Sequence, residues 1–146
     1  MIKLENVYKR FGEGETGVDA LSGVNLEVSS GEFLAVMGTS GSGKTTLLNI
    51  LGAMDTASEG KYCFNDIDVS SLSAKMLHRF RREHISFVFQ HFSLLGRYTV
   101  YENVEIPLIA RAVPANKRRE LVTNALKTVG IEKLKDKKPI NISGGE

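Results

Sequence analysis

The chain has 146 residues, of which 42% are hydrophobic and 25% are charged, and its formal net charge is +2. A chain of this length forms one domain or part of one, which argues against a second independent domain. The composition is that of an ordinary globular protein, and so small a charge does not indicate nucleic-acid binding. The single Cys63 excludes an internal disulfide, and no apolar run reaches the roughly 20 residues of a membrane-spanning helix. We therefore expect a cytoplasmic protein without a leader peptide, whose role at a membrane would need a separate membrane partner.

The amino-terminal third predicts strands. Residues Ile2 to Tyr8 and Val24 to Val28 alternate apolar and polar side chains, and residues 29–31 end the second run as a turn. These two segments are expected to form paired edge strands. Phe33 to Met37 is a short, continuous apolar run that ends in glycine, which is typical of a fully buried parallel strand.

A leucine-bearing segment from Thr45 to about Ala53 predicts a helix after this strand. Its core face is expected to carry Leu47, Leu48 and Leu51.

The middle of the chain predicts further strands and a second helix. Tyr62, Phe64 and the run Ile85 to Phe89 are strand candidates, so the expected sheet is mixed. Ser73 has the position of a helix cap. The helix that it would cap is expected to carry Met76, Leu77 and Phe80 on one side.

The last third is predicted to be mainly helical. Apolar residues keep helical spacing from Pro114 to Val129, and Gly130 stands where a helix is expected to stop. The apolar positions are Leu121, Val122, Ala125, Leu126 and Val129.

The segment Gly38 to Thr45 carries the strongest chemical signal. It reads G-T-S-G-S-G-K-T and matches G-x-x-x-x-G-K followed by Ser or Thr, between a predicted strand and a predicted helix. Glycines let the backbone curl until successive N–H groups face phosphate oxygens, and the following helix adds its positive dipole end. Lys44 supplies a positive charge to the terminal phosphates, and the Thr45 hydroxyl is placed to ligate Mg²⁺. The predicted phosphate-binding residues are Gly38, Ser40, Gly41, Ser42, Gly43, Lys44, Thr45 and Thr46.

This loop alone leaves kinases, GTPases, motors and transport ATPases open, so other motifs must decide the class. The chain ends in N-I-S-G-G-E, Asn141 to Glu146, where a serine and two glycines offer a hydroxyl and unobstructed N–H groups. Gln90 closes the run I-S-F-V-F-Q, and Phe11 lies in K-R-F-G near the amino terminus. With these motifs, nearly the whole chain resembles the ATP-binding cassette (ABC) family.

The resemblance implies a role for each motif. Ser143, Gly144 and Gly145 would form the signature loop, which contacts the γ-phosphate held by the opposite subunit. Gln90 would reach Mg²⁺ and the attacking water, and would report the nucleotide state to the membrane partner. Phe11 would stack on adenine, a contact that needs only a flat π face. A core position for Phe11 is the alternative.

The resemblance also implies an architecture and a function. We expect an α/β fold with a P-loop core of mixed sheet and antiparallel edge strands over residues 1–91, followed by the start of a helical subdomain over residues 92–146. T-V-Y-E-N-V-E-I-P-L and G-A-M-D resemble the branch that exports lipoproteins, peptides and macrolides or serves cell division. Two subunits would bind two MgATP molecules and drive a membrane permease from the inner face of the membrane, without nucleic acid.

The chain ends before two elements of the family pattern, an apolar strand ending in Asp-Glu and a switch histidine. The expectation is therefore a truncated ATPase that is inactive alone and lacks its catalytic carboxylate. A non-hydrolysing nucleotide-binding fragment or sensor is one alternative. An ABC-type ATPase of DNA repair is another, although such proteins separate the two motifs by a long coiled coil and here 53 positions separate Gln90 from Ser143.

Overall fold

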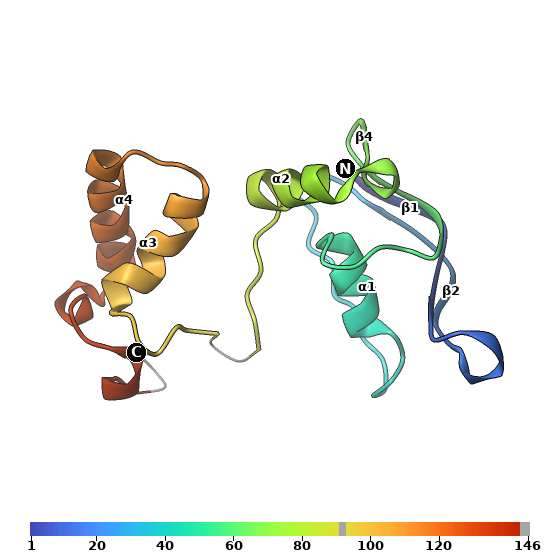
Figure 1. Cartoon of the computed structure of the whole chain (residues 1–146), viewed down its shortest axis with the longest axis horizontal. Coiled ribbons are helices and arrows are strands. Elements are labelled where there is room, and N and C mark those ends of the chain that lie inside the picture. The colour runs from blue at the N-terminus through green and yellow to red at the C-terminus, as the bar shows by residue number, and fades with distance from the viewer. Residues whose placement is uncertain (91–92, 144–146) are drawn as a thin grey trace. The chain divides into compact units, whose positions relative to one another are not determined.

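The computed structural model describes residues 1–90 and 93–143 and divides the chain into two compact units, residues 1–87 and 88–146 (Figure 1). Each unit has its own hydrophobic core. Leu4 and Ile50 lie in the core of the first unit, and Val122 and Leu126 lie in that of the second. The sequence predicted a nucleotide-binding core up to residue 91, and this functional boundary stays a prediction.

The first unit is built on a four-stranded antiparallel sheet in the order β2-β1-β3-β4. Its strands are β1 (Ile2–Phe11), β2 (Val18–Val28), β3 (Glu59–Phe64) and β4 (Ile67–Asp68). Leu4 of β1 lies opposite Leu26 of β2 on one side and Tyr62 of β3 on the other. The predicted pairing of the first two strands is confirmed, but β1 lies inside this sheet because β3 pairs with its second side.

Helix α1 (Lys44–Leu51) packs its apolar face against the core of the first unit. Ile50 is buried, and Leu47 and Leu51 pack against the same cluster. These residues form an i, i+3, i+4 stripe, which is typical of a helix that packs one face on a core. Leu48 falls outside this stripe and is exposed, so its predicted place in the core is wrong.

Helix α2 (Ala74–His84) begins at the predicted cap. The Ser73 hydroxyl accepts a hydrogen bond from the Met76 N–H at 3.4 Å, which confirms the capping prediction. Phe80 is buried edge-on against Phe64, with ring centroids 5.3 Å apart, whereas Met76 is exposed and does not join the predicted face. At the other end of the helix, Arg81 donates to the Ala53 carbonyl at 2.6 Å.

Two predicted strands do not form. Neither Phe33 to Met37 nor Ile85 to Phe89 forms a strand. Within the described residues, the strand pairs are β1 with β2, β1 with β3 and β3 with β4, and all are antiparallel. Phe33 is 95% exposed and Val88 is 100% exposed, so the prediction of a fully buried strand at Phe33 to Met37 is wrong. Among residues 1–90 and 93–143, the sheet consists of β1 to β4, and neither segment is part of it.

The second unit is helical. Helices α3 (Val100–Ala110) and α4 (Ala115–Thr128) pack around Val100, Val122 and Leu126. The predicted helix corresponds to α4 and is confirmed, with Gly130 just beyond its end at φ +77°. Leu121, Ala125 and Val129 are exposed and lie outside the core stripe.

Helix α3 starts at a capping box that the motif reading missed. The Thr99 hydroxyl accepts from the Glu102 N–H, and the Glu102 carboxylate accepts from the Thr99 N–H. No helix within residues 1–90 and 93–143 is long and apolar enough to cross a membrane. Short 3-10 turns occur at Gly14–Thr16, Val69–Ser71, Glu132–Leu134 and Pro139–Asn141.

Candidate functional site

The glycine loop, residues 38–43, leads directly into α1, and its last residue fixes its shape. Gly43 is the amino-terminal cap of α1 and has φ +84°, a conformation that side chains rarely adopt. A Cβ at this position would lie 2.4 Å from the Ala20 carbonyl oxygen and 3.1 Å from a Leu21 methyl group. The loop therefore lies directly against β2, and only glycine permits this approach.

The loop closes on itself at its two ends. The Ser42 N–H donates to the Thr39 carbonyl at 3.3 Å, and the Ser42 hydroxyl lies 2.6 Å from where a Cβ of Gly38 would be. Ser40 and Gly41 form the exposed tip, with Gly41 at φ +80°. The predicted residues thus form one curl of backbone at the start of α1.

Lys44 folds back over this curl. Its ammonium group donates to the Gly38 carbonyl at 3.0 Å, the Thr39 carbonyl at 2.5 Å and the Ser42 hydroxyl at 3.4 Å. All three acceptors are neutral, and no carboxylate of the described residues forms an ion pair with this ammonium. The loop therefore holds a positive charge whose counterion it does not supply.

The amino terminus of α1 adds further positive potential. The first N–H groups of a helix have no partner within the helix, and the helix dipole places a partial positive charge there. Gly43 offers no capping side chain, and the first turn carries no acidic residue. Thr45 lies exposed in this turn, next to the half-buried Thr46. The start of α1 thus carries backbone amides, a hydroxyl residue and an ammonium within a few positions, which is the donor set for a phosphate group.

Phe11 ends β1 opposite Val18 of β2, and its side chain is 47% exposed. This exposure does not fit the core alternative, and stacking on adenine stays a prediction. The Lys9 ammonium lies 4.9 Å from the centroid of the Phe11 ring. Tyr8, another aromatic residue of β1, lies beside Gly23, where a Cβ would be 3.0 Å from the Tyr8 hydroxyl.

Gln90 and Ser143 belong to the second unit. Of the predicted site residues, the glycine loop and Phe11 lie in the first unit. Gln90 is exposed at a bend and does not end a strand, because residues 85–89 do not form one. Ser143 is also exposed. Gly144 and Gly145 lie outside the described residues. Metal binding by Gln90 and nucleotide binding by the signature loop stay predictions.

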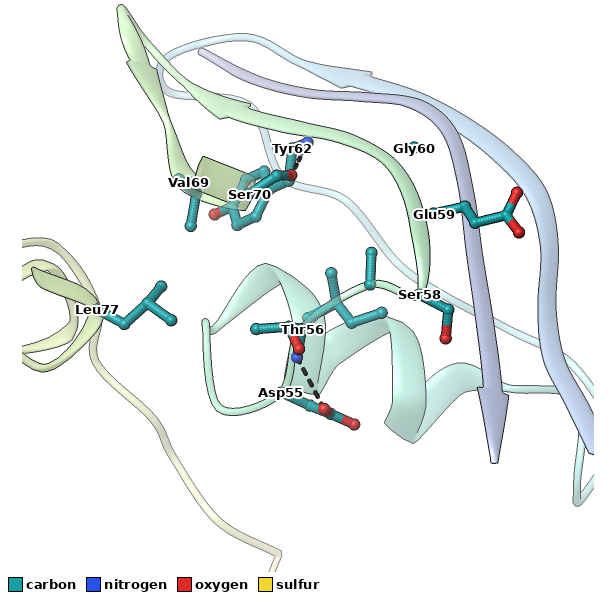
Figure 2. Close-up of a pocket in the computed structure, with 11 residues that line it drawn as sticks. Asp55, Thr56, Ser58, Glu59, Gly60, Tyr62, Val69, Ser70 and Leu77 are labelled. Carbon is teal, nitrogen blue, oxygen red and sulfur yellow. Dashed lines mark hydrogen bonds between the residues drawn. The ribbon is translucent and has the colours of Figure 1, made fainter. Parts of the chain in front are cut away.

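A pocket of about 200 Å³ in the first unit was not predicted (Figure 2). Two of its polar side chains already have partners: the Tyr62 hydroxyl donates to the Leu51 carbonyl at 2.7 Å, and the Ser70 hydroxyl accepts from the Tyr62 N–H at 2.7 Å. Burial raises the pKa of Tyr62 to about 12, so this hydroxyl stays protonated. No buried side-chain nitrogen or oxygen in the described part of the chain lacks a partner. The pocket therefore shows no buried polar side chain that awaits a ligand.

Asp55 lies at the rim of this pocket and was missed as a residue of interest (Figure 2). It forms an ion pair with Lys9 at 2.6 Å. No sequence signal could have found this pair, because 46 positions separate Lys9 from Asp55.

Comparison with known proteins decides the family. Residues 21–146 match the ABC transporter family. The chain belongs to this family. The α/β fold that the sequence predicted is confirmed as that of an ABC ATPase cassette, because solved cassettes have the same fold.

Three similar proteins show how far the likeness extends. The macrolide export ATP-binding/permease protein MacB of Vibrio parahaemolyticus is 40% identical over 146 residues, which are all of this chain and 22% of MacB. The uncharacterized ABC transporter ATP-binding protein YvrO of Bacillus subtilis is 42% identical over all of this chain and 64% of its own length. A dimeric cassette, MJ0796, solved in a post-hydrolysis state bound to ADP and Pi, has a TM-score of 0.88 at 42% identity and covers 99% of this chain and 64% of its own.

The chain thus spans about a fifth of MacB and less than two thirds of the single-cassette relatives.

Proposed function

We propose that this chain is the nucleotide-binding part of an ABC transporter ATPase. It binds MgATP in the glycine loop, and the full-length protein hydrolyses ATP as one of two paired subunits to drive a membrane permease. The observation that carries this proposal is the Lys44 ammonium, held over a glycine loop at the start of α1 with no counterion among the residues that the structure describes. The MJ0796 cassette bound to ADP and Pi, and the permease part of MacB, support the nucleotide and the partner.

Lys44 is the main phosphate ligand in this proposal. Its present partners are neutral carbonyl and hydroxyl oxygens. Hydrogen bonds to a charged oxygen are roughly twice as strong as neutral ones. Exchange of these acceptors for β- and γ-phosphate oxygens is therefore favourable.

The other residues serve the remaining parts of MgATP. Thr45 and Gln90 hold Mg²⁺, which offsets the phosphate charge when it is bound. Phe11 stacks on adenine with its exposed ring surface. The signature loop, Ser143 to Gly145, contacts the nucleotide of the paired subunit.

The place of action follows from the permease. The cassette lies on the inner face of the membrane, where it binds the cytoplasmic side of the permease. Similarity to MacB favours an exporter-like transporter.

The direct test is an ATP titration of the full-length protein and its Lys44→Ala variant in the presence of Mg²⁺. We expect at least about a tenfold loss of affinity, because the phosphates lose their cation. Lys117→Ala is the matched control, since Lys117 is an exposed lysine of α4 in the second unit. Equal ATP affinities of wild type and Lys44→Ala would refute the assignment of the loop.

Catalysis is tested by phosphate release with the same three proteins. We expect release that depends on Lys44 and is unaffected by Lys117→Ala. Binding without any Lys44-dependent release would favour the nucleotide-sensor alternative.

A further inference from the structure

The side chain of Lys9 in β1 is held in place by two hydrogen bonds. Its ammonium donates to the Asp55 carboxylate at 2.6 Å and to the Thr56 carbonyl at 2.8 Å. Only 12% of its side chain is exposed, against 43% for Lys3 of the same strand. A lysine with two fixed acceptors and little exposure has lost most of its rotamer freedom. Its charge is therefore fixed in position.

Asp55 is itself fixed and charged. Its carboxylate accepts from the Thr56 N–H at 2.7 Å as well as from Lys9. Burial opposes ionisation of this carboxyl, but the hydrogen bonds from Lys9 and Thr56 outweigh it, so the pKa of Asp55 lies below its usual range. The turn after α1 thus presents a permanent anion to β1.

The fixed ammonium also faces Phe11. Lys9 and Phe11 are two residues apart in β1, so their side chains lie on the same side of the strand. The ammonium lies 4.9 Å from the ring centroid, within the range of a cation–π contact. With 47% of Phe11 still exposed, the ring is supported by Lys9 and keeps open surface.

We infer that Lys9 is a positioning residue for the nucleotide base: held by Asp55 and the Thr56 carbonyl, it fixes the Phe11 ring in the orientation that receives adenine. This assignment rests on the proposed function and adds two residues, Lys9 and Asp55, to the base end of the site. Lys9 then favours ATP through the ring and not through the phosphates. Its effect must vanish when the ligand has no base, and also when the ring is absent.

The experiment compares ATP with inorganic triphosphate, which offers the phosphates alone. Both are titrated with Mg²⁺ into the full-length protein and into Lys9→Met, which keeps an unbranched side chain and removes the charge. We expect ATP affinity to fall about three- to tenfold and triphosphate affinity to stay unchanged. In a Phe11→Ala background, Lys9→Met should have no further effect on ATP affinity.

Two controls separate position from charge in general. Lys3→Met removes a lysine of the same strand whose partner, Glu5, lies at 2.6 Å in an exposed pair, and it should leave both affinities unchanged. Lys9→Arg keeps a cation and should bind ATP within about twofold of wild type. Asp55→Asn removes the anion that holds Lys9 and should show the same ATP-specific loss, which provides a second variant should Lys9→Met fail to fold.

Three results would overturn the inference. One is an equal loss of ATP and triphosphate affinity in Lys9→Met, and another is an undiminished effect of Lys9→Met in the Phe11→Ala background. The third is unchanged ATP affinity in Asp55→Asn. Failure of the proposed function looks different, because Lys44→Ala would then leave ATP affinity unchanged. An ineffective Phe11→Ala alone would remove the roles of Phe11 and Lys9 and leave the phosphate site intact.

Discussion

The contacts inside the first unit differ in kind from those inside the second. In the first unit, β1 pairs with a strand far along the chain, so that Ile2 lies opposite Phe64. In the second, the capping box and the neighbouring helices α3 and α4 are formed by residues close in sequence. The phosphate-binding loop lies in the unit with the long-range pairings, and its shape depends on the approach of Gly43 to Ala20 of β2. The shape of the loop thus depends on a distant contact, while the capping box of the helical unit is a local one.

The largest expected effect tests whether the units are independent. Leu126→Ala should destabilise the second unit by about 2 to 5 kcal/mol, because Leu126 is fully buried between the helices. Urea unfolding gives the size, and amide hydrogen exchange should show faster exchange in residues 88–143 only. Leu121→Ala is the control on the same helix, since Leu121 is exposed. Faster exchange throughout the sheet as well would contradict independent cores.

A smaller effect is expected in the first unit. Gly43→Ala should cost about 1 to 3 kcal/mol, because it forces a side chain into a left-handed conformation and against the Ala20 carbonyl. Gly41→Ala is a matched control: its φ is +80°, but a Cβ there meets nothing within 4 Å. Urea denaturation of both variants should show the greater loss for Gly43→Ala. Equal losses would mean that the contact with β2 does not constrain the loop.

The smallest effects concern the local signals of the second unit. Thr99→Ala should cost about 1 kcal/mol, because it removes the cap of α3. The Thr99 N–H and hydroxyl donate to Glu102 and hold the pKa of that carboxyl below its usual range. Because the pKa of Glu102 is lower in the folded state, the ionised carboxyl stabilises the folded protein when the pH is above the pKa of the unfolded state. This stabilisation is lost as the pH falls through the pKa of the folded state.

The pH dependence can be checked by thermal melts taken from neutral pH into the acidic range. Glu102→Gln should flatten part of this dependence and leave the stability of the sheet unchanged. An identical acid profile for wild type and variant would exclude Glu102 as a contributor.

Local signals were the part of the structure that sequence reasoning predicted well. The Ser73 cap, helix α4 with Gly130, and the motif of the glycine loop can each be recognised from residues within a few positions of one another. The strand predictions were wrong for Phe33 to Met37 and Ile85 to Phe89, because an apolar run does not show which strand will pair with it. The predicted burial of Met76 was wrong for a different reason. Helical spacing shows which face of a helix is apolar, but not how many residues of that face are buried.

The candidate site was predictable to a similar degree. The pattern from Gly38 to Thr45 names the phosphate ligands by itself, because glycine and lysine have special properties in any fold. Nothing in the sequence joins Lys9 to Asp55, since 46 positions separate them and only the pairing of the strands brings them together.

Helix α1 is electrostatically compensated at one end only. Beyond its carboxyl end, the Arg81 guanidinium donates to the Ala53 carbonyl and offsets the negative pole of the helix. Its amino end has no acidic residue and no capping side chain. A bound phosphate would therefore act as the missing cap of this helix end. Nucleotide binding would then stabilise the folded state of the first unit.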